Sequence, residues 1–165
     1  MRCERWASEG STLQLGFTAG VHPHDASKFT EDTLQKLEAL ATSPFCVALG
    51  ECGLDYDRMF SPRDVQLAAF RAQCALAKRL DRSLFVHVRE KEEGEMLGAY
   101  RDAVAVMTEA QLIPDKVCVH CFTGSVDELA ALVDFGCRVG FTGFLGIAKR
   151  SGATREAVAS FKDRL

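Results

Sequence analysis

The chain has 165 residues, of which 47% are hydrophobic and 26% are charged, a composition typical of a globular protein with a sizeable core. A net charge of −3 and a pI of about 5.8 exclude a broadly basic surface, although they do not exclude a nucleic-acid partner. No apolar run approaches the ~18 residues of a membrane span, and residues 1–11 lack the apolar core of an export signal. We therefore expect a protein of the cytoplasm, with the nucleus also open, that has no membrane partner.

Apolar runs typical of strands alternate with helical patterns along the whole chain. The predicted strands cover residues 13–21, 45–50, 83–88, 116–122 and 137–142. Helices are expected after each of them, because leucines and alanines recur there at helical spacing. Thr30, Ser61 and Ser125 are the predicted caps of three of these helices, and Ser125 forms a capping box with Glu128. Gly136 is expected to end one helix.

Strands and helices that alternate in this way predict a parallel sheet with crossover helices. A complete barrel of eight such units needs about 250 residues, which exceeds this length. We therefore expect an α/β fold, a TIM-type (β/α)8 barrel that is here a partial barrel of about five βα units, in one domain over residues 1–165. Such an arc leaves two parallel edges open, which predicts self-association or a partner that covers them.

Three of the apolar runs end in a polar residue that is expensive to bury alone. These residues are Glu51, His87 and His120. Because the carboxyl ends of parallel strands meet at one edge of a barrel, we expect the three side chains to converge. Imidazole nitrogens and carboxylate oxygens suit zinc or manganese, and magnesium less well. The alternative is that each histidine is a hydrogen-bonded core residue and that Glu51 anchors a loop.

Four segments together resemble the successive signatures of the TatD-type metal-dependent deoxyribonucleases. The segments are GVHPHD at 20–25, GECGLDY at 50–56, VHVR at 86–89 and VHCFTG at 119–124. The resemblance runs over nearly the whole chain and implies a (β/α)8 barrel that hydrolyses phosphodiester bonds in DNA with two divalent ions (Mg, Mn or Zn). By the same resemblance Glu51 is the catalytic residue that bridges the ions, and His87 and His120 are ligands of the second ion.

The family also has an opening Asp-x-His-x-His strand and a closing Glu-Thr-Asp strand, and neither pattern occurs in this sequence. We therefore expect an incomplete metal site. His22 and His24 have the spacing of the opening pair but belong to the separate GVHPHD segment, where Pro23 interrupts a regular strand. A substrate-binding or structural role is expected for both. Arg89 lies two residues beyond His87 and is a further candidate for binding a phosphate.

Two alternatives stay open. The chain could be a barrel fragment without catalysis, or a related metallohydrolase that acts on amides, lactones or phosphotriesters.

Cys118 and Cys121 have the spacing of a zinc knuckle, but they lie on a predicted strand and would face opposite sides of it. Structural zinc is therefore not expected, and the seven cysteines are expected to be reduced thiols.

Overall fold

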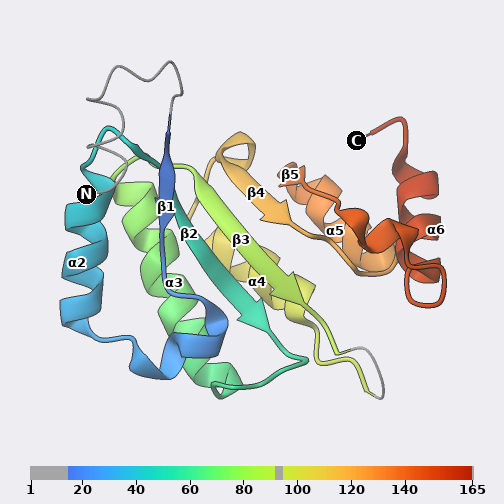
Figure 1. The fold of residues 1–165 in the computed structure, drawn as a ribbon, viewed down its shortest axis with the longest axis horizontal. Coiled ribbons are helices and arrows are strands. Elements are labelled where there is room, and N and C mark those ends of the chain that lie inside the picture. Colours follow the sequence, from blue (N-terminus) through green and yellow to red (C-terminus); the bar gives the residue numbers. More distant parts are fainter. Residues whose placement is uncertain (1–14, 92–94, 165) are drawn as a thin grey trace.

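A computed structural model of the protein describes residues 15–91 and 95–164. Within these ranges a five-stranded parallel sheet has the order β1-β2-β3-β4-β5, with a helical segment after every strand (Figure 1). The strands are β1 (Phe17–Ala19), β2 (Cys46–Asp55), β3 (Leu84–Arg89), β4 (Val117–His120) and β5 (Arg138–Val139). The α-helices are α2 (Glu31–Ala41), α3 (Arg63–Arg79), α4 (Ala99–Glu109), α5 (Val126–Phe135) and α6 (Gly152–Phe161). Short 3-10 helices are η1 (Pro23–Lys28), η2 (Pro114–Lys116) and η3 (Gly143–Gly146). The predicted α/β fold with about five βα units is confirmed.

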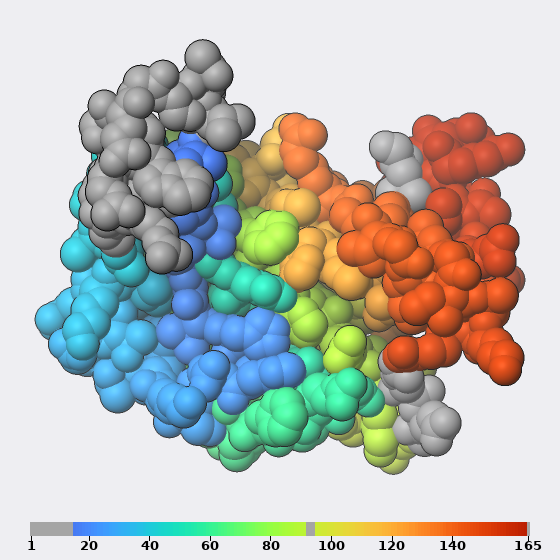
Figure 2. Space-filling model, in the orientation of Figure 1, coloured from blue at the N-terminus to red at the C-terminus, as the bar shows by residue number. Residues whose placement is uncertain are grey.

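The helices cover one face of the sheet and leave the other face open. α3 packs on β2 and α4 packs on β3, and Figure 1 shows both helices behind the strands. Side chains alternate along β3 and β4, where Leu84, Val86 and Val119 are buried in the core and the residues between them are partly exposed. Figure 2 shows atoms of β2, β3 and β4 uncovered between η1 and the C-terminal helices. None of the described helices is long and apolar enough to cross a membrane.

β2 is longer than the sequence pattern predicts. It continues past Gly50 to Asp55, and the pairing with β3 shifts by one residue between Gly50 and Cys52. Beyond this shift Gly53 lies beside His87, with a φ of +135° and so close that an added Cβ would lie 2.0 Å from the His87 carbonyl oxygen. Only glycine fits there, so the residue that resembles a turn signal in the sequence instead allows the strand to continue.

Most of the predicted helix ends are confirmed. Thr30 caps α2 and Ser125 forms the capping box with Glu128, while Gly136 ends α5 with a φ of +88°. The predicted cap at Ser61 is wrong, because Pro62 precedes the first residue of α3 and the Ser61 hydroxyl is used elsewhere. It accepts a hydrogen bond from the Ser27 N–H and donates one to a carbonyl of η1. The predicted strand 13–21 begins outside the described residues, and β5 is shorter than predicted.

Candidate metal centre

The three residues predicted as metal ligands meet on neighbouring strands: Glu51 lies within β2 at its register shift, His87 lies near the end of β3, and His120 is the last residue of β4. His120 Nε2 lies 2.7 Å from Glu51 Oε1, and His87 Nδ1 lies 3.2 Å from the same oxygen. The Phe85 ring stacks on His120, with centroids 4.4 Å apart, and holds that imidazole in place. The expected convergence of the three side chains is therefore present, although Glu51 does not end its strand as predicted, because β2 continues to Asp55.

A third imidazole reaches the same carboxylate. His22 Nε2 lies 3.5 Å from Glu51 Oε1, and ligand atoms of His22, Glu51 and His87 all lie within 4.8 Å of one another. His22 Nδ1 accepts a hydrogen bond from the His24 N–H, which leaves Nε2 available toward Glu51. Two imidazoles and one carboxylate form a donor set that suits zinc or manganese, so these residues fit a divalent ion. The structure thus adds His22 to the group that sequence reasoning assigned to the metal.

Asp55 holds two of the histidines from behind. Its Oδ2 accepts hydrogen bonds from His24 Nε2 at 2.7 Å and from His87 Nε2 at 3.2 Å. With Nε2 of His87 donating to Asp55, the Nδ1 atom of that ring faces Glu51 with its lone pair. A carboxylate that fixes a histidine in this way is the usual support for a metal ligand. His24 therefore contacts Asp55 rather than Glu51. Its ring lies beside the Phe60 ring, with the two centroids 4.7 Å apart.

The Asp55 side chain is fully buried and ionised. Burial alone would raise its pKa, but hydrogen bonds from His87, from the Arg58 N–H and from His24 together hold the pKa well below its usual range. Gln66 accepts from the Asp55 N–H and donates to its carbonyl, which fixes the backbone of the residue. Sequence reasoning missed Asp55, since it was read as part of a loop. The one sequence feature that sets it apart is its position between the large hydrophobic residues Leu54 and Tyr56, both of which the structure buries.

Helix α3 fixes the segment that carries His22. Gln73 accepts a hydrogen bond from the Val21 N–H at 2.7 Å and donates one to the Val21 carbonyl at 3.1 Å. Gly20 allows β1 to approach β2 closely, because an added Cβ would lie 2.5 Å from Gly50 Cα. Gln73 therefore anchors the turn between β1 and η1, and the Ser61 hydroxyl anchors η1 itself.

The surroundings of the cluster favour an ionised Glu51 and a neutral His22. Burial would raise the pKa of Glu51, but the hydrogen bond from His120 and the nearby histidine charges lower the pKa below its ordinary value. Burial, followed by the charge of His87, lowers the pKa of His22. An ionised carboxylate and a neutral imidazole are the forms that bind a metal ion.

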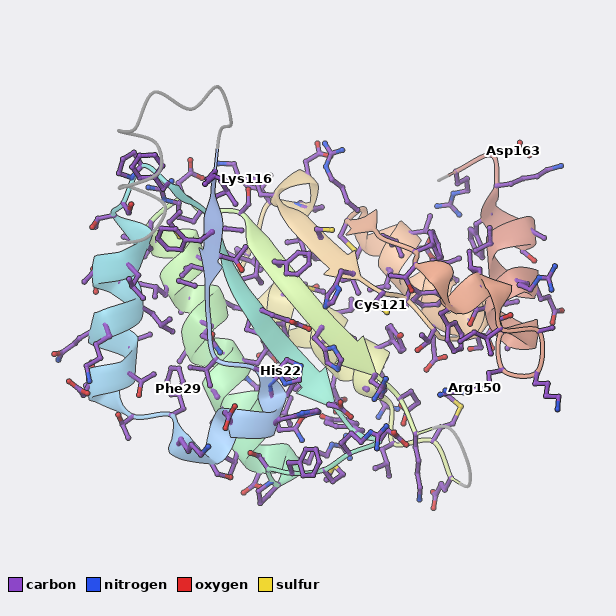
Figure 3. All side chains as sticks on the ribbon, viewed as in Figure 1. His22, Phe29, Lys116, Cys121, Arg150 and Asp163 are labelled. Carbon is purple, nitrogen blue, oxygen red and sulfur yellow. The ribbon has the colours of Figure 1, made fainter. Side chains whose placement is uncertain are left out.

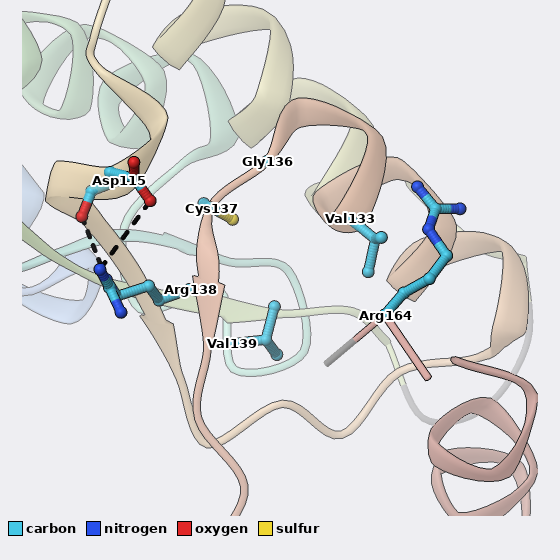
Figure 4. A pocket seen from close by; sticks show the side chains of 7 residues that line it. All are labelled: Asp115, Val133, Gly136, Cys137, Arg138, Val139 and Arg164. Atoms are coloured by element: carbon cyan, nitrogen blue, oxygen red, sulfur yellow. Dashed lines mark hydrogen bonds and ion pairs between the residues drawn. The ribbon is translucent and has the colours of Figure 1, made fainter. Parts of the chain in front are cut away.

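Arg89 lies at the rim of this cluster rather than in it. Its guanidinium is 4.0 Å from Asp57 Oδ2 and remains partly exposed. Figure 3 shows His22 toward the end of the sheet to which the arrows of β2 and β3 point, with Lys116 at the opposite end. A cavity of about 370 Å³ near Asp115 and Arg138 lies at that opposite end, where β4 and β5 begin (Figure 4). It is therefore remote from the histidines.

A comparison with known protein families covers nearly the whole chain. The model of the "TatD related DNase" family matches residues 2–164. A 3′–5′ ssDNA/RNA exonuclease TatD of Enterobacter lignolyticus is 42% identical over 140 residues, which are 84% of this chain and 50% of that protein. The enzyme of the same name from Pantoea ananatis is 42% identical over 139 residues, again 84% of this chain and 50% of that protein. The chain spans about half the length of the curated relatives that it matches.

Solved structures give the same result. A TatD homologue from Escherichia coli K12 has a TM-score of 0.73 at 25% identity and covers 95% of this chain and 59% of its own. A TatD family hydrolase from Entamoeba histolytica has a TM-score of 0.70 at 27% identity and covers 86% of this chain and 46% of its own. With the family model, the curated relatives and the fold in agreement, the chain belongs to the TatD related DNase family.

Proposed function

We propose that this chain carries the metal site of a divalent-metal-dependent hydrolase that cleaves phosphodiester bonds in single-stranded DNA. The observation that supports the proposal most is the convergence of His22, His87 and His120 on Glu51 Oε1. A carboxylate surrounded by imidazoles that lie toward the carboxyl ends of parallel strands is placed close to where barrel enzymes hold their metals. The names of the relatives supply the substrate class, single-stranded DNA or RNA, and we take DNA as the substrate.

We assign the ligands from the hydrogen bonds of each ring. His22 and His87 would bind through Nε2 and Nδ1, because their other ring nitrogens are engaged by the His24 N–H and by Asp55. Glu51 would bridge two ions, and His120 would complete the shell of the second ion; magnesium, manganese and zinc are the candidate metals. When bound, such ions lower the pKa of a coordinated water and stabilise negative charge on a phosphate.

The remaining residues of the site would position ligands and substrate. Asp55 holds the ring of His87 so that its lone pair faces Glu51, and it holds His24 in the same way. We propose that His24 and Arg89 lie on the substrate side, where the guanidinium would form charge-assisted hydrogen bonds with a phosphate. A water nucleophile would then approach the phosphorus from the open face of the sheet.

A metal-dependent nuclease assay on end-labelled single-stranded DNA tests the proposal. Hydrolysis should require manganese, zinc or magnesium and should fall by more than about 100-fold in Glu51→Gln, since even residues that only support a ligand cost up to that factor. Glu109→Gln on α4, an exposed glutamate paired with Arg71, is the matched control and should retain activity. Hydrolysis that persists in EDTA or in Glu51→Gln would contradict the proposal.

The same preparations decide between the alternatives. Hydrolysis of a phosphotriester or a lactone without DNA cleavage would favour a different substrate. The fold is also similar to that of a phosphotriesterase homology protein from Escherichia coli, at 13% identity and a TM-score of 0.65. Metal-dependent thermal stabilisation without any hydrolysis would identify a metal-binding barrel fragment. No stabilisation by any of the three metals would exclude the metal site itself.

Two further proposals concern the setting of the protein. β1 and β5 are the edges of the described sheet, and Val47, at the start of β2 beside β1, is 60% exposed. We propose that a second copy of the chain covers the β1 edge and Val47 and leaves the site toward the other end of the strands open to substrate. We also propose a cytoplasmic location, which is supported by the described cysteines, all of them free thiols.

A further inference from the structure

A cavity of about 370 Å³ is lined by the segments that follow β3 and β4. Its walls include Glu90 and Lys91, just beyond His87 in the chain, and residues 123–125, just beyond His120. The loop before α6 closes it with Lys149 and Arg150, and Figure 3 shows Arg150 toward the end of the sheet where β3 terminates. The volume is at the small end of ligand pockets, with room for one nucleotide and not for a duplex.

The cavity combines basic residues with exposed apolar surface, in a chain whose net charge is −3. Lys91, Lys149 and Arg150 are the basic residues, and all three are exposed. The Arg150 guanidinium lies over the Phe144 ring, 5.6 Å from its centroid, and Met96 is 54% exposed. Cations beside an aromatic ring form the combination that holds a nucleotide of a single strand, with the base stacked and the phosphate paired.

The two carboxylates in the walls differ in their hydrogen bonds. Glu90 is buried and accepts from the backbone N–H groups of Lys91, Leu97, Gly98 and Ala99, so its acceptors are used. Glu128 uses only Oε2, which accepts from the Ser125 N–H and hydroxyl. Its Oε1 is buried and has no hydrogen-bond partner among the described residues. A buried carboxylate oxygen without a donor is unfavourable, and a ligand that supplies an N–H would relieve this.

We propose that this cavity is a nucleotide subsite that selects bases with an exocyclic amino group. Cytosine is the base of choice for a test, since a carboxylate accepts from its N4 amino group. The base stacks on Phe144 and donates to Glu128 Oε1, while its phosphate lies between Lys91 and Lys149. The inference rests on the proposed function, because it places this nucleotide on a DNA strand that continues to the metal centre.

Fluorescence anisotropy in EDTA measures binding without hydrolysis, with labelled oligocytidylate and oligothymidylate DNA of about ten nucleotides, several subsites in length. The parent should bind oligocytidylate about fivefold more tightly, the factor that one net hydrogen bond provides. Glu128→Gln keeps an acceptor for Ser125 but offers a neutral amide to the base, so the preference should disappear. An unchanged preference in Glu128→Gln would overturn the proposal.

Lys149→Ala tests the phosphate contact separately. The slope of log affinity against log salt should become shallower by about 0.7, the value for one contact with a single strand, for both oligonucleotides. Lys36→Ala is the control, because this exposed lysine pairs with Asp32 on α2, far from the cavity, and its slope should equal that of the parent. An unchanged slope in Lys149→Ala would contradict the phosphate assignment.

Phe144→Leu leaves the capping box of α5 intact and should weaken both oligonucleotides by about fivefold or more, since stacking is independent of sequence; equal binding would overturn the stacking role. The binding results stand apart from the nuclease assay. Selective binding without hydrolysis would support the subsite and contradict the enzyme, whereas hydrolysis without selective binding would contradict the subsite alone.

Discussion

Asp102 ties the start of α3 to the chain that leaves β2. Its Oδ2 accepts hydrogen bonds from the Tyr56 hydroxyl at 2.8 Å and from Arg63 Nη2 at 2.6 Å. Burial would raise the pKa of Asp102, but the hydrogen bonds from Arg63 and Tyr56 together lower the pKa below its ordinary value. Because Tyr56 follows Asp55 directly, Asp102 also helps to hold Asp55, the buried residue that accepts hydrogen bonds from His24 and His87.

Asp102→Asn should lower the free energy of unfolding at pH 7 by about 1–2 kcal/mol, because the charge-assisted bond with Arg63 is lost. A carboxyl group whose pKa is lower in the folded state stabilises the fold above its unfolded pKa of about 3.9 and stops doing so as the pH falls through the folded pKa. The deficit of Asp102→Asn should therefore shrink below pH 4. Urea titrations at pH 7 and below pH 4 measure the free energy of unfolding. Asp134→Asn is the control, because Asp134 forms an exposed ion pair with Arg164. A deficit that stays constant with pH would refute this account.

Which residues of the candidate site could be predicted from the sequence depended on the pattern around each residue. Glu51, His87 and His120 were visible because each interrupts an apolar run, and an interruption of that kind is expensive without a partner. Asp55 was not visible, since an aspartate two residues after a glycine, Gly53, is compatible with a turn. The sequence did not predict His22 as a metal ligand for a similar reason. Pro23 argues against a strand, and the 3-10 helix η1, which begins directly after His22, has no hydrophobic periodicity that the sequence could show.

Among the elements, α3 acts as the support of the site. Its residues Gln66 and Gln73, both buried, hold the backbone of Asp55 and of Val21 through paired amide hydrogen bonds. Helical spacing identified the apolar face of α3 from the sequence, but glutamines on that face carry no signal of which backbone they bind. Tertiary contacts of this kind follow from the fold and not from the local pattern.

Gln73→Leu should weaken the binding of manganese or zinc by about 10–100-fold while the protein remains folded, because the turn that carries His22 loses its anchor. Isothermal titration of each metal measures the affinity, and circular dichroism confirms the fold. Gln35→Leu, on the exposed side of α2, makes the same chemical change without touching the turn. Equal metal affinity in parent and Gln73→Leu would show that His22 is not a ligand.

For the whole molecule, the order of elements and the parallel sheet followed from the sequence, whereas several strand limits did not. β2 runs five residues further than the predicted limit of Gly50, to Asp55, because Gly53 packs against the backbone of His87. The open face is also a property of the whole fold. Every second residue of β3 is partly exposed, and the structure leaves that face of the sheet uncovered.

Sedimentation equilibrium should give a mass close to twice the 18.1 kDa of the chain if a second copy covers the β1 edge and Val47. Val47→Lys should shift the mass to that of the monomer, because it places a charge in the apolar contact. Ile113→Lys is the control, an exposed apolar residue before η2, which leads into β4 rather than into the β1–β2 side of the sheet, and it should leave the mass unchanged. A monomeric parent would disprove this assembly.

The link between Gln73 and Val21 joins residues 52 positions apart in the chain. Contacts of such separation form late in folding, because a long loop must close before they stabilise anything. The candidate metal site is complete only when this loop has closed. A bound ion should therefore prolong the lifetime of the folded protein by slowing its unfolding, and should leave the refolding rate almost unaltered.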